Sequence, residues 1–355
     1  TINQSHRNEH LSSILYYAVF FPIVEVLSAM SIGLIVWYGG QGILSGKDIT
    51  VGELIAFILF IHMMFRPIRQ LADRFNILQM GIVGSERVFK VLDTDTKITD
   101  LGKNTLENMA GAISFKDVDF SYKQDEWVLK GLTFDIKAGK MLALVGRTGA
   151  GKTSIISVLN RFYETQKGTI AIDGIDIETV QLANLRENIA LVQQEVFLFS
   201  DSIFNNITLF DTHITRVKII EAAKEIGVHN FIEALPNAYD YVVGERGVTL
   251  SAGQRQLIAF LRVYVRNPKI LILDEATSSI DTATEELLQN ALEKLSKDRT
   301  TIVIAHRLST VVKADKILHL KNGSVLEEGT HKHLLQSGGA YAEMYNLQES
   351  VSLDK

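Results

Sequence analysis

The chain of 355 residues carries a net charge of −5 at pH 7 and contains no cysteine. The lack of thiols excludes disulfides, thiol catalysis and cysteine-ligated zinc, and the negative charge argues against a surface that coats nucleic acid. The length allows two or three domains. Hydrophobic residues make up 46% of the chain, slightly rich for a soluble enzyme, and the excess gathers in residues 1–90.

The first long apolar run extends from Leu11 to Tyr38, with Glu25 as its only charge. As a helix it would be roughly 42 Å long, enough to cross a hydrocarbon core of about 30 Å with some tilt. Trp37 and Tyr38 at one end are typical of a membrane interface. The run therefore predicts a membrane span at about 11–38. A buried hairpin in a soluble protein is the alternative.

A second apolar run begins at Val51, and its pattern continues to residue 92 without a turn signal. We expect one long helix that crosses the membrane at about 51–70 and then extends into the cytoplasm. Basic residues recur along this extension, whereas the loop between the runs has only Lys47, so both ends of the segment are expected in the cytoplasm. Residues 1–92 would then be part of an all-α transmembrane domain.

Ionisable residues within or close to the two spans are candidates for the lining of a substrate cavity. Interhelical hydrogen bonds or anchoring at the membrane interface are the alternative roles. The candidates are Glu25, His62, Arg66 and Arg69.

After a polar linker over 93–111, the pattern changes to short strands and helices typical of an α/β domain, expected over 112–337 with a C-terminal tail over 338–355. In this domain GRTGAGKT follows a strand-like apolar run and precedes a helical one. This is the GxxxxGK[ST] phosphate loop of a P-loop NTPase in the context that confirms it. The expected ATP-binding residues of the loop are Gly146, Arg147, Thr148, Gly149, Ala150, Gly151, Lys152, Thr153 and Ser154.

Each part of this loop has a physical reason. The glycines let the backbone bend so that its N–H groups face the phosphates. Lys152 is expected to reach the β and γ oxygens, and the Thr153 hydroxyl to hold Mg²⁺.

Two further buried strands end in ionisable residues. KILILDE ends in adjacent carboxylates that point to opposite sides, so Asp274 suits the Mg²⁺ shell through water, and Glu275 suits the general base for an attacking water. TTIVIAHR brings His306 to the carboxyl edge of a parallel sheet, where ligands bind in such folds. Solvated acids and a structural histidine are the alternative interpretations.

The stretch TLSAGQRQ opens an amphipathic helix at Ser251, whose hydroxyl and following amides are suited to an anion. With the phosphate loop and the two strand ends, it makes the chain similar to ATP-binding cassette (ABC) transporters of the exporter type. LSAGQ resembles the family's signature motif, usually LSGGQ, and Ala252 in place of glycine matters only if the position requires a positive φ. The signature residues are Leu250, Ser251, Ala252, Gly253 and Gln254.

The resemblance assigns roles to further residues. Tyr122 in DFSY would be the aromatic that stacks on adenine. Gln194 in VQQE resembles the loop glutamine that meets Mg²⁺ and water, although Gln193 fits the physics equally. Asp281 matches the acid of the loop after the catalytic carboxylate, and His306 matches the family's switch histidine. The resemblance also implies a helical subdomain at about 182–262.

In the ABC family two cassettes pack head to tail, and the signature of each covers the ATP on the other. The resemblance therefore implies ATP and Mg²⁺ as cofactors and a second copy or a homologous half-transporter as partner, with no nucleic acid. It implies an integral protein of a bacterial inner membrane, with its cassette in the cytoplasm. Other proteins with a similar cassette would look different. Repair proteins would carry long coiled coils, importers would have a separate soluble cassette, and P-loop kinases would lack the signature.

MFRPIRQL (64–71) resembles the last spanning helix of bacterial lipid-flipping and multidrug half-transporters, so a lipid or an amphiphilic drug-like molecule is the expected substrate. A peptide or bacteriocin exporter and the intact subunit of a heterodimeric multidrug exporter are alternatives. Family exporters carry six spanning helices per half. The chain is therefore interpreted as the C-terminal part, with the last two spans and the cassette.

Overall fold

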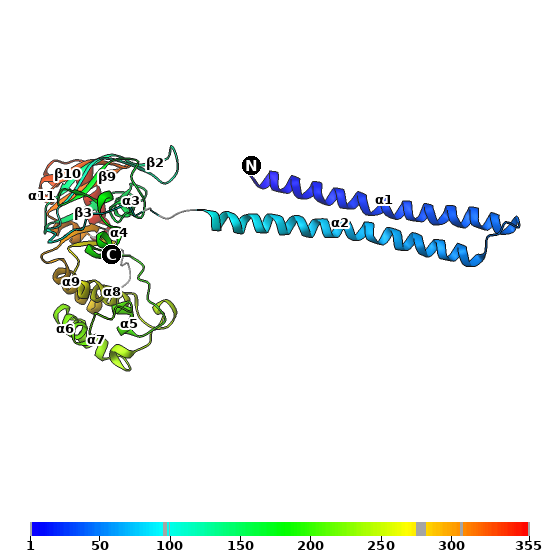
Figure 1. The fold of residues 1–355 in the computed structure, drawn as a ribbon. Coiled ribbons are helices and arrows are strands. Elements are labelled where there is room, and N and C mark those ends of the chain that lie inside the picture. The colour runs from blue at the N-terminus through cyan, green and yellow to red at the C-terminus, as the bar shows by residue number, and fades with distance from the viewer. Residues whose placement is uncertain (1, 95–97, 99, 275–281, 306–307, 354–355) are drawn as a thin grey trace. The chain divides into compact units, whose positions relative to one another are not determined.

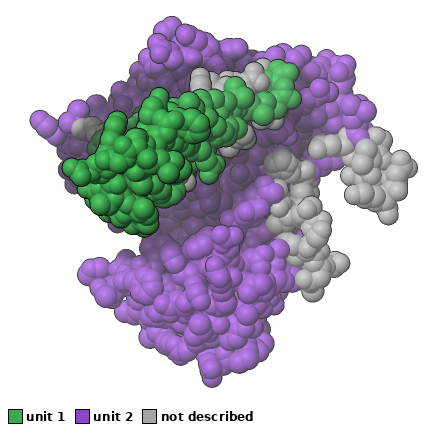
Figure 2. Space-filling model, turned by 90° about the vertical axis from the view of Figure 1, so that its right-hand side faces the viewer, with its two compact units in different colours: residues 1–97 green, residues 98–355 purple. Residues whose placement is uncertain are grey.

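The computed structural model of the protein describes residues 2–94, 98, 100–274, 282–305 and 308–353 (Figure 1). The chain divides into two compact units, residues 1–97 and residues 98–355, which Figure 2 colours separately. The division falls inside the polar segment that the sequence marks as a linker.

The first unit consists of two long helices, α1 (Ile2–Leu44) and α2 (Val51–Asp93), and α2 is uninterrupted as expected. Each contains a stretch long and apolar enough to cross a membrane, Ala18–Leu44 and Val51–Ile68. The first stretch ends beyond the expected limit at residue 38 because α1 continues through three glycines to its end. Only 11% of each stretch's apolar window is buried, which argues against the core of a soluble hairpin.

A narrow seam joins the two helices. Val24 of α1 packs with Ile61 and Phe65 of α2, and these are the buried apolar residues of the described part of the unit. Near the loop, a Cβ on Gly39 would lie 2.5 Å from Leu54 Cδ1, so the glycine lets the helices approach closely. Ile32 and Ile35 of α1 are partly buried against this seam, whereas many of the other described apolar side chains of both helices are exposed.

The second unit contains two sheets in its described residues. The main sheet has the strand order β10-β9-β3-β8-β7-β6, in which all neighbours from β9 to β6 are parallel and β10 is antiparallel to β9. The smaller sheet is antiparallel, with the order β2-β1-β4-β5. The main strands are β3 (Met141–Val145), β6 (Ile189–Val192), β7 (Ile270–Asp274), β8 (Thr300–Ile304), β9 (Lys316–Lys321) and β10 (Ser324–Gly329). The others are β1 (Ile113–Ser121), β2 (Trp127–Ile136), β4 (Lys167–Ile172) and β5 (Ile175–Asp176).

Helices lie on both faces of the main sheet. Alternate residues of β7 point to opposite faces, so Ile272 joins a core shared with the smaller sheet, whereas Leu271 and Leu273 join a core shared with helices. The helices are α3 (Lys152–Leu159), α4 (Leu182–Asn188), α5 (Ile203–Thr208), α6 (Arg216–Ile226), α7 (His229–Glu233), α8 (Ala252–Arg266), α9 (Thr282–Ser296), α10 (Leu308–Lys313), α11 (His331–Gln336) and α12 (Ala340–Leu353). Three short 3₁₀ helices complete the described part of the unit, η1 (Ile177–Thr179), η2 (Ala238–Asp240) and η3 (Glu245–Gly247).

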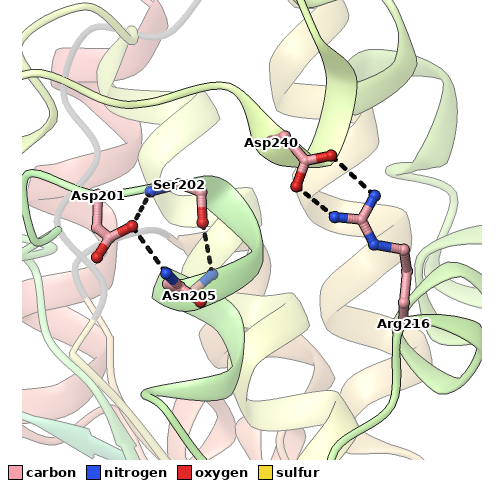
Figure 3. A network of polar contacts seen from close by, with 5 residues as sticks. All are labelled: Asp201, Ser202, Asn205, Arg216 and Asp240. Carbon is pink, nitrogen blue, oxygen red and sulfur yellow. Dashed lines mark hydrogen bonds and ion pairs between the residues drawn. The ribbon is translucent and has the colours of Figure 1, made fainter.

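Helices α5–α8 share one apolar core. Polar contacts cap the start of α5 and join α6 to η2 (Figure 3). The Asp201 carboxylate accepts the Ser202 N–H at 2.6 Å and the Asn205 side-chain amide at 2.8 Å. Arg216, at the start of α6, donates to both carboxylate oxygens of Asp240. This helical region begins after β6, so the range of 182–262 expected from the sequence also includes one strand of the main sheet.

Candidate nucleotide-binding site

Four sequence motifs follow parallel strands that end at one edge of the main sheet. Leu144 of β3 lies level with Ile304 of β8, and Ile304 lies level with Asp274 of β7. Val192 of β6 lies level with Leu273 of β7. The phosphate loop, Asp274 and the glutamine motif therefore lie at or directly after strand ends at this common edge, where ligands bind in open α/β folds.

The phosphate loop has the backbone that its glycines predict. Gly146, Gly149 and Gly151 have φ values of +149°, +82° and +100°. A Cβ on Gly146 would lie 2.5 Å from the carbonyl oxygen of Leu320, so a larger residue would clash with the backbone of β9. Gly151 ends the loop and caps α3, so the N-terminus of that helix opens at the loop.

Lys152 reaches back over the loop to which it belongs. Its Nζ donates to the carbonyl oxygens of Gly146 at 2.7 Å and Arg147 at 3.1 Å. Burial lowers the pKa of this ammonium, and the negative charge of Asp274 opposes that shift. The electrostatic link joins the phosphate loop to the end of β7, as expected for two parts of one site.

The other loop positions differ in their exposure. The side chains of Arg147, Thr148 and Thr153 are exposed, whereas those of Ala150 and Ser154 are buried. The exposed Thr153 hydroxyl lies on the first turn of α3, the position at which the sequence predicts a Mg²⁺ ligand.

Tyr122, the expected adenine platform, lies directly after β1 and is 47% exposed. Its hydroxyl lies 3.1 Å from the Ser154 hydroxyl on α3, so the ring is tied to the helix of the phosphate loop. Phe120 and Tyr163 meet the ring edge to face, with centroid distances of 4.8 and 5.0 Å. Tyr163 was not predicted from the sequence, because no motif marks an aromatic residue that follows a helix.

The residues expected at the other strand ends are only partly described. Gln193 and Gln194 are both exposed directly after β6, so both alternatives for the loop glutamine stay open. Asp274 is partly buried as the last residue of β7. The predictions for Glu275, Asp281 and His306 fall outside the described residues.

The signature stretch forms the turn into α8. Ser251 caps the helix: its hydroxyl accepts the Gln254 N–H at 3.2 Å, and its own N–H donates to the Gln254 side chain at 2.9 Å. Ala252 is the first residue of α8 and does not have a positive φ, so alanine is unstrained there. Leu250 is buried and Gly253 packs inside, whereas Ser251 and Ala252 are exposed.

Three of the four candidate cavity residues of the first unit have described side chains. Glu25, His62 and Arg66 are exposed, and within the described residues none of the three forms an ion pair with another residue. The side chain of Arg69 falls outside the described part of α2. The structure therefore leaves these polar groups available to surroundings other than the α1–α2 pair.

Known proteins match both units. A family model described as ABC transporter matches residues 129–278, and one described as ABC transporter transmembrane region matches residues 1–68. The chain is 41% identical to the uncharacterized ABC transporter ATP-binding protein YknV of Bacillus subtilis, over 99% of this chain and 58% of that relative. It is 40% identical to the ATP-dependent lipid A-core flippase of Pasteurella multocida, over 98% of this chain and 60% of that relative.

A solved structure of a bacterial Atm1-family ABC exporter with ATP bound is similar, with a TM-score of 0.68 and 36% identity. The similarity covers 97% of this chain and 59% of that one, so this chain spans well under two thirds of the proteins that it matches. The matches cover the helical pair and the α/β unit in the same order as in the relatives. With its membrane helices followed by a nucleotide-binding α/β domain, the chain belongs to the ABC transporter family.

Proposed function

We propose that the chain hydrolyses ATP to drive the export, or the transfer between leaflets, of a lipid or amphiphilic molecule across a bacterial inner membrane. The observation that carries this proposal is the edge of the main sheet. There a phosphate loop, the Asp274 carboxylate and the glutamine motif lie at or directly after the ends of parallel strands of one sheet, in a chain that also has two candidate membrane spans.

The roles of the residues follow from the chemistry of phosphoryl transfer. The amides of residues 146–151 and the Lys152 ammonium would hold the phosphates, and Tyr122 would stack on the base. Thr153, Gln194 and Asp274 offer hydroxyl, amide and carboxylate oxygens, the hard ligands that Mg²⁺ prefers, with Asp274 acting through water. Bound Mg²⁺ would neutralise charge on the phosphates.

The proposed general base is Glu275, the residue after the buried strand β7. A carboxylate there would polarise the attacking water, and His306 would contact the γ-phosphate from the end of β8. Asp281 would lie in the loop that follows the base. These three assignments rest on the sequence.

The working unit would contain two cassettes. The exposed Ser251 and Ala252 begin α8, whose core is separate from the core that carries the phosphate loop. We propose that this helix start covers the ATP of a second copy or of a homologous half-transporter, so that ATP joins the cassettes and hydrolysis releases them.

The proposed substrate class draws on the relatives. Several relatives are ATP-dependent lipid A-core flippases, and the exposed apolar faces of α1 and α2 suit contact with lipid tails. Arg66 adds an exposed cation close to the end of the second candidate span, which favours a lipid phosphate or another amphiphilic anion.

The first test is ATP hydrolysis by the 355-residue chain in lipid, measured across a series of protein concentrations. We expect Glu275→Gln to lower the rate by about 100- to 10,000-fold, because the general base is lost, while ATP binding is kept. Lys152→Ala should instead weaken ATP binding itself. Hydrolysis near the wild-type rate in Glu275→Gln would rule that residue out as the base.

The concentration series also tests the number of cassettes. A specific activity that rises with protein concentration supports two copies that complete each other's sites. A wild-type chain that binds ATP but stays inactive at every concentration would instead require a different partner or further helices.

A further inference from the structure

The segment that follows α3, residues 161–166, forms hydrogen bonds with the backbone just before Tyr122. The Gln166 side chain accepts the Ser121 N–H at 2.8 Å and donates to the Ser121 carbonyl oxygen at 3.1 Å. The Gln166 N–H also donates to the Asp119 carbonyl oxygen at 3.1 Å. The backbone pairing of β1 with β4 ends at Asp119 and Lys167, and the Gln166 side chain adds a further pair of hydrogen bonds to β1 at Ser121.

The same segment supports the ring of Tyr122. Tyr163 stands perpendicular to Tyr122 at a centroid distance of 5.0 Å and also contacts the buried Phe120 at 5.8 Å. Edge-to-face packing of this kind restricts the ring to a narrow range of orientations. The hydrogen bonds to the Ser121 backbone and the aromatic contact with Tyr122 therefore both come from residues 163–166.

The base of this support is rigid. Arg161, which is almost completely buried, begins the segment and donates from Nη1 to the carbonyl oxygens of Ile177 at 3.1 Å and Val180 at 2.9 Å. Its φ of +47° turns the chain out of α3 toward the smaller sheet. Movement of the segment would break these buried contacts, so it is a fixed support rather than a mobile loop.

We propose that Gln166 is a positioning residue for the base of the bound nucleotide and that it acts through Tyr122. This inference rests on the proposed function, in which Tyr122 stacks on adenine. Ser121 is only 8% exposed, so without the Gln166 amide its N–H and carbonyl oxygen would lose partners that solvent replaces poorly. The strand end would then relax, and part of the binding free energy would be used to order the platform again.

The test separates the base from the phosphates. Inorganic tripolyphosphate offers phosphates to the loop but no base to Tyr122, so its affinity should not depend on the platform. The dissociation constants of ATP and tripolyphosphate would be measured by calorimetry for the 355-residue chain in lipid nanodiscs. The variants are Gln166→Ala and Gln166→Met, of which the second keeps the length of the side chain, and Gln336→Ala, an exposed glutamine on α11, is the control.

We expect both Gln166 variants to bind ATP about fivefold more weakly, as the loss of roughly one net hydrogen bond predicts, and to bind tripolyphosphate as the wild type does. Gln336→Ala should match the wild type for both ligands. Wild-type ATP affinity in the Gln166 variants, or an equal loss for both ligands, would overturn the inference alone. A wild-type chain that binds tripolyphosphate but not ATP would overturn the proposed function, and the inference with it.

Discussion

The two units of the chain differ in where their large apolar side chains lie. In the second unit, Phe115, Leu132 and Ile155 are completely buried between the sheets and α3. In the first unit, Leu59 and Phe60 of α2 are 56% and 60% exposed, and many of the described large apolar side chains of α1 are exposed as well. The units therefore differ in whether their large apolar side chains are covered by the chain itself.

This difference shows which unit the chain itself stabilises. The second unit buries its apolar surface against its own strands and helices, which is the main favourable term in folding. The first unit satisfies its backbone within two helices, as a membrane requires, but leaves its apolar faces to lipid or to further protein. Core substitutions should thus weaken the second unit strongly and the first unit hardly at all.

The largest expected effect comes from a matched pair of leucines. Leu132→Ala removes a fully buried side chain from β2 and should destabilise the second unit by about 2–5 kcal/mol. Leu59→Ala, on an exposed face of α2, should change the free energy of unfolding by less than about 0.5 kcal/mol. Trp37 and Trp127 are the only two tryptophans of the chain, so the fluorescence of Trp127 in a Trp37→Phe background reports the second unit during urea unfolding.

The comparison would fail in either of two ways. A loss below about 1 kcal/mol for Leu132→Ala would mean that the second unit does not depend on its own core. A large decrease in the free energy of unfolding reported by Trp127 for Leu59→Ala would mean that the stability of the second unit depends on α2.

A smaller effect is expected from the arginines near the end of the second candidate span, on the stimulation of ATP hydrolysis by anionic lipid. Arg66→Ala with Arg69→Ala should raise, by about 30-fold, the concentration of anionic lipid that half-maximally stimulates ATP hydrolysis, since each of the two cations contributes about 1 kcal/mol near an anionic surface. Arg87→Ala, an exposed arginine of α2 beyond the candidate spans, is the control. Stimulation that is unchanged in the double variant would assign these arginines to anchoring alone.

The sequence predicted the parts of the site that are continuous along the chain. The strand–loop–helix around Lys152 and the buried strand before Asp274 were recognisable because four to eight neighbouring residues carry each pattern. The Tyr163 and Gln166 contacts were not, because they depend on how β1 pairs with β4, which brings residues 45 positions apart together.

Boundaries were predicted less well than elements, and for physical reasons. α1 extends to Leu44 through Gly39, Gly40 and Gly42, and glycines are poor helix formers, so no local pattern predicts that the helix continues. β6 is a short edge strand among helices, and four residues give too little periodicity to separate it from them. The choice between Gln193 and Gln194 depends on a side-chain direction that no local pattern sets.

The smallest expected effect concerns the end of the second unit, where a polar contact holds the last helix. The Glu327 carboxylate accepts the N–H groups of Ala340 at 3.0 Å and Tyr341 at 2.7 Å, in the first turn of α12, and lies 3.4 Å from His319 Nδ1. Burial raises the pKa of this carboxyl, but the hydrogen bonds from Tyr341, His319 and Ala340 together outweigh it, so the pKa lies below its ordinary value of 4.5.

A carboxyl group whose folded pKa is lowered contributes stability above its unfolded pKa and loses it as the pH falls through the folded pKa. We therefore expect Glu327→Gln to lower the Tm of the second unit at pH 7, and the difference from the wild type to shrink as the pH falls below about 4.5. Glu343→Gln, an exposed glutamate on α12, should show no such trend. Scans from about pH 3 to pH 7 measure this. A Tm difference that is the same at every pH would mean that the charge of Glu327 does not hold α12. The shape of the side chain and the apolar packing of Tyr341 would then hold the helix, so that the second unit stabilises even its last helix by packing within the chain.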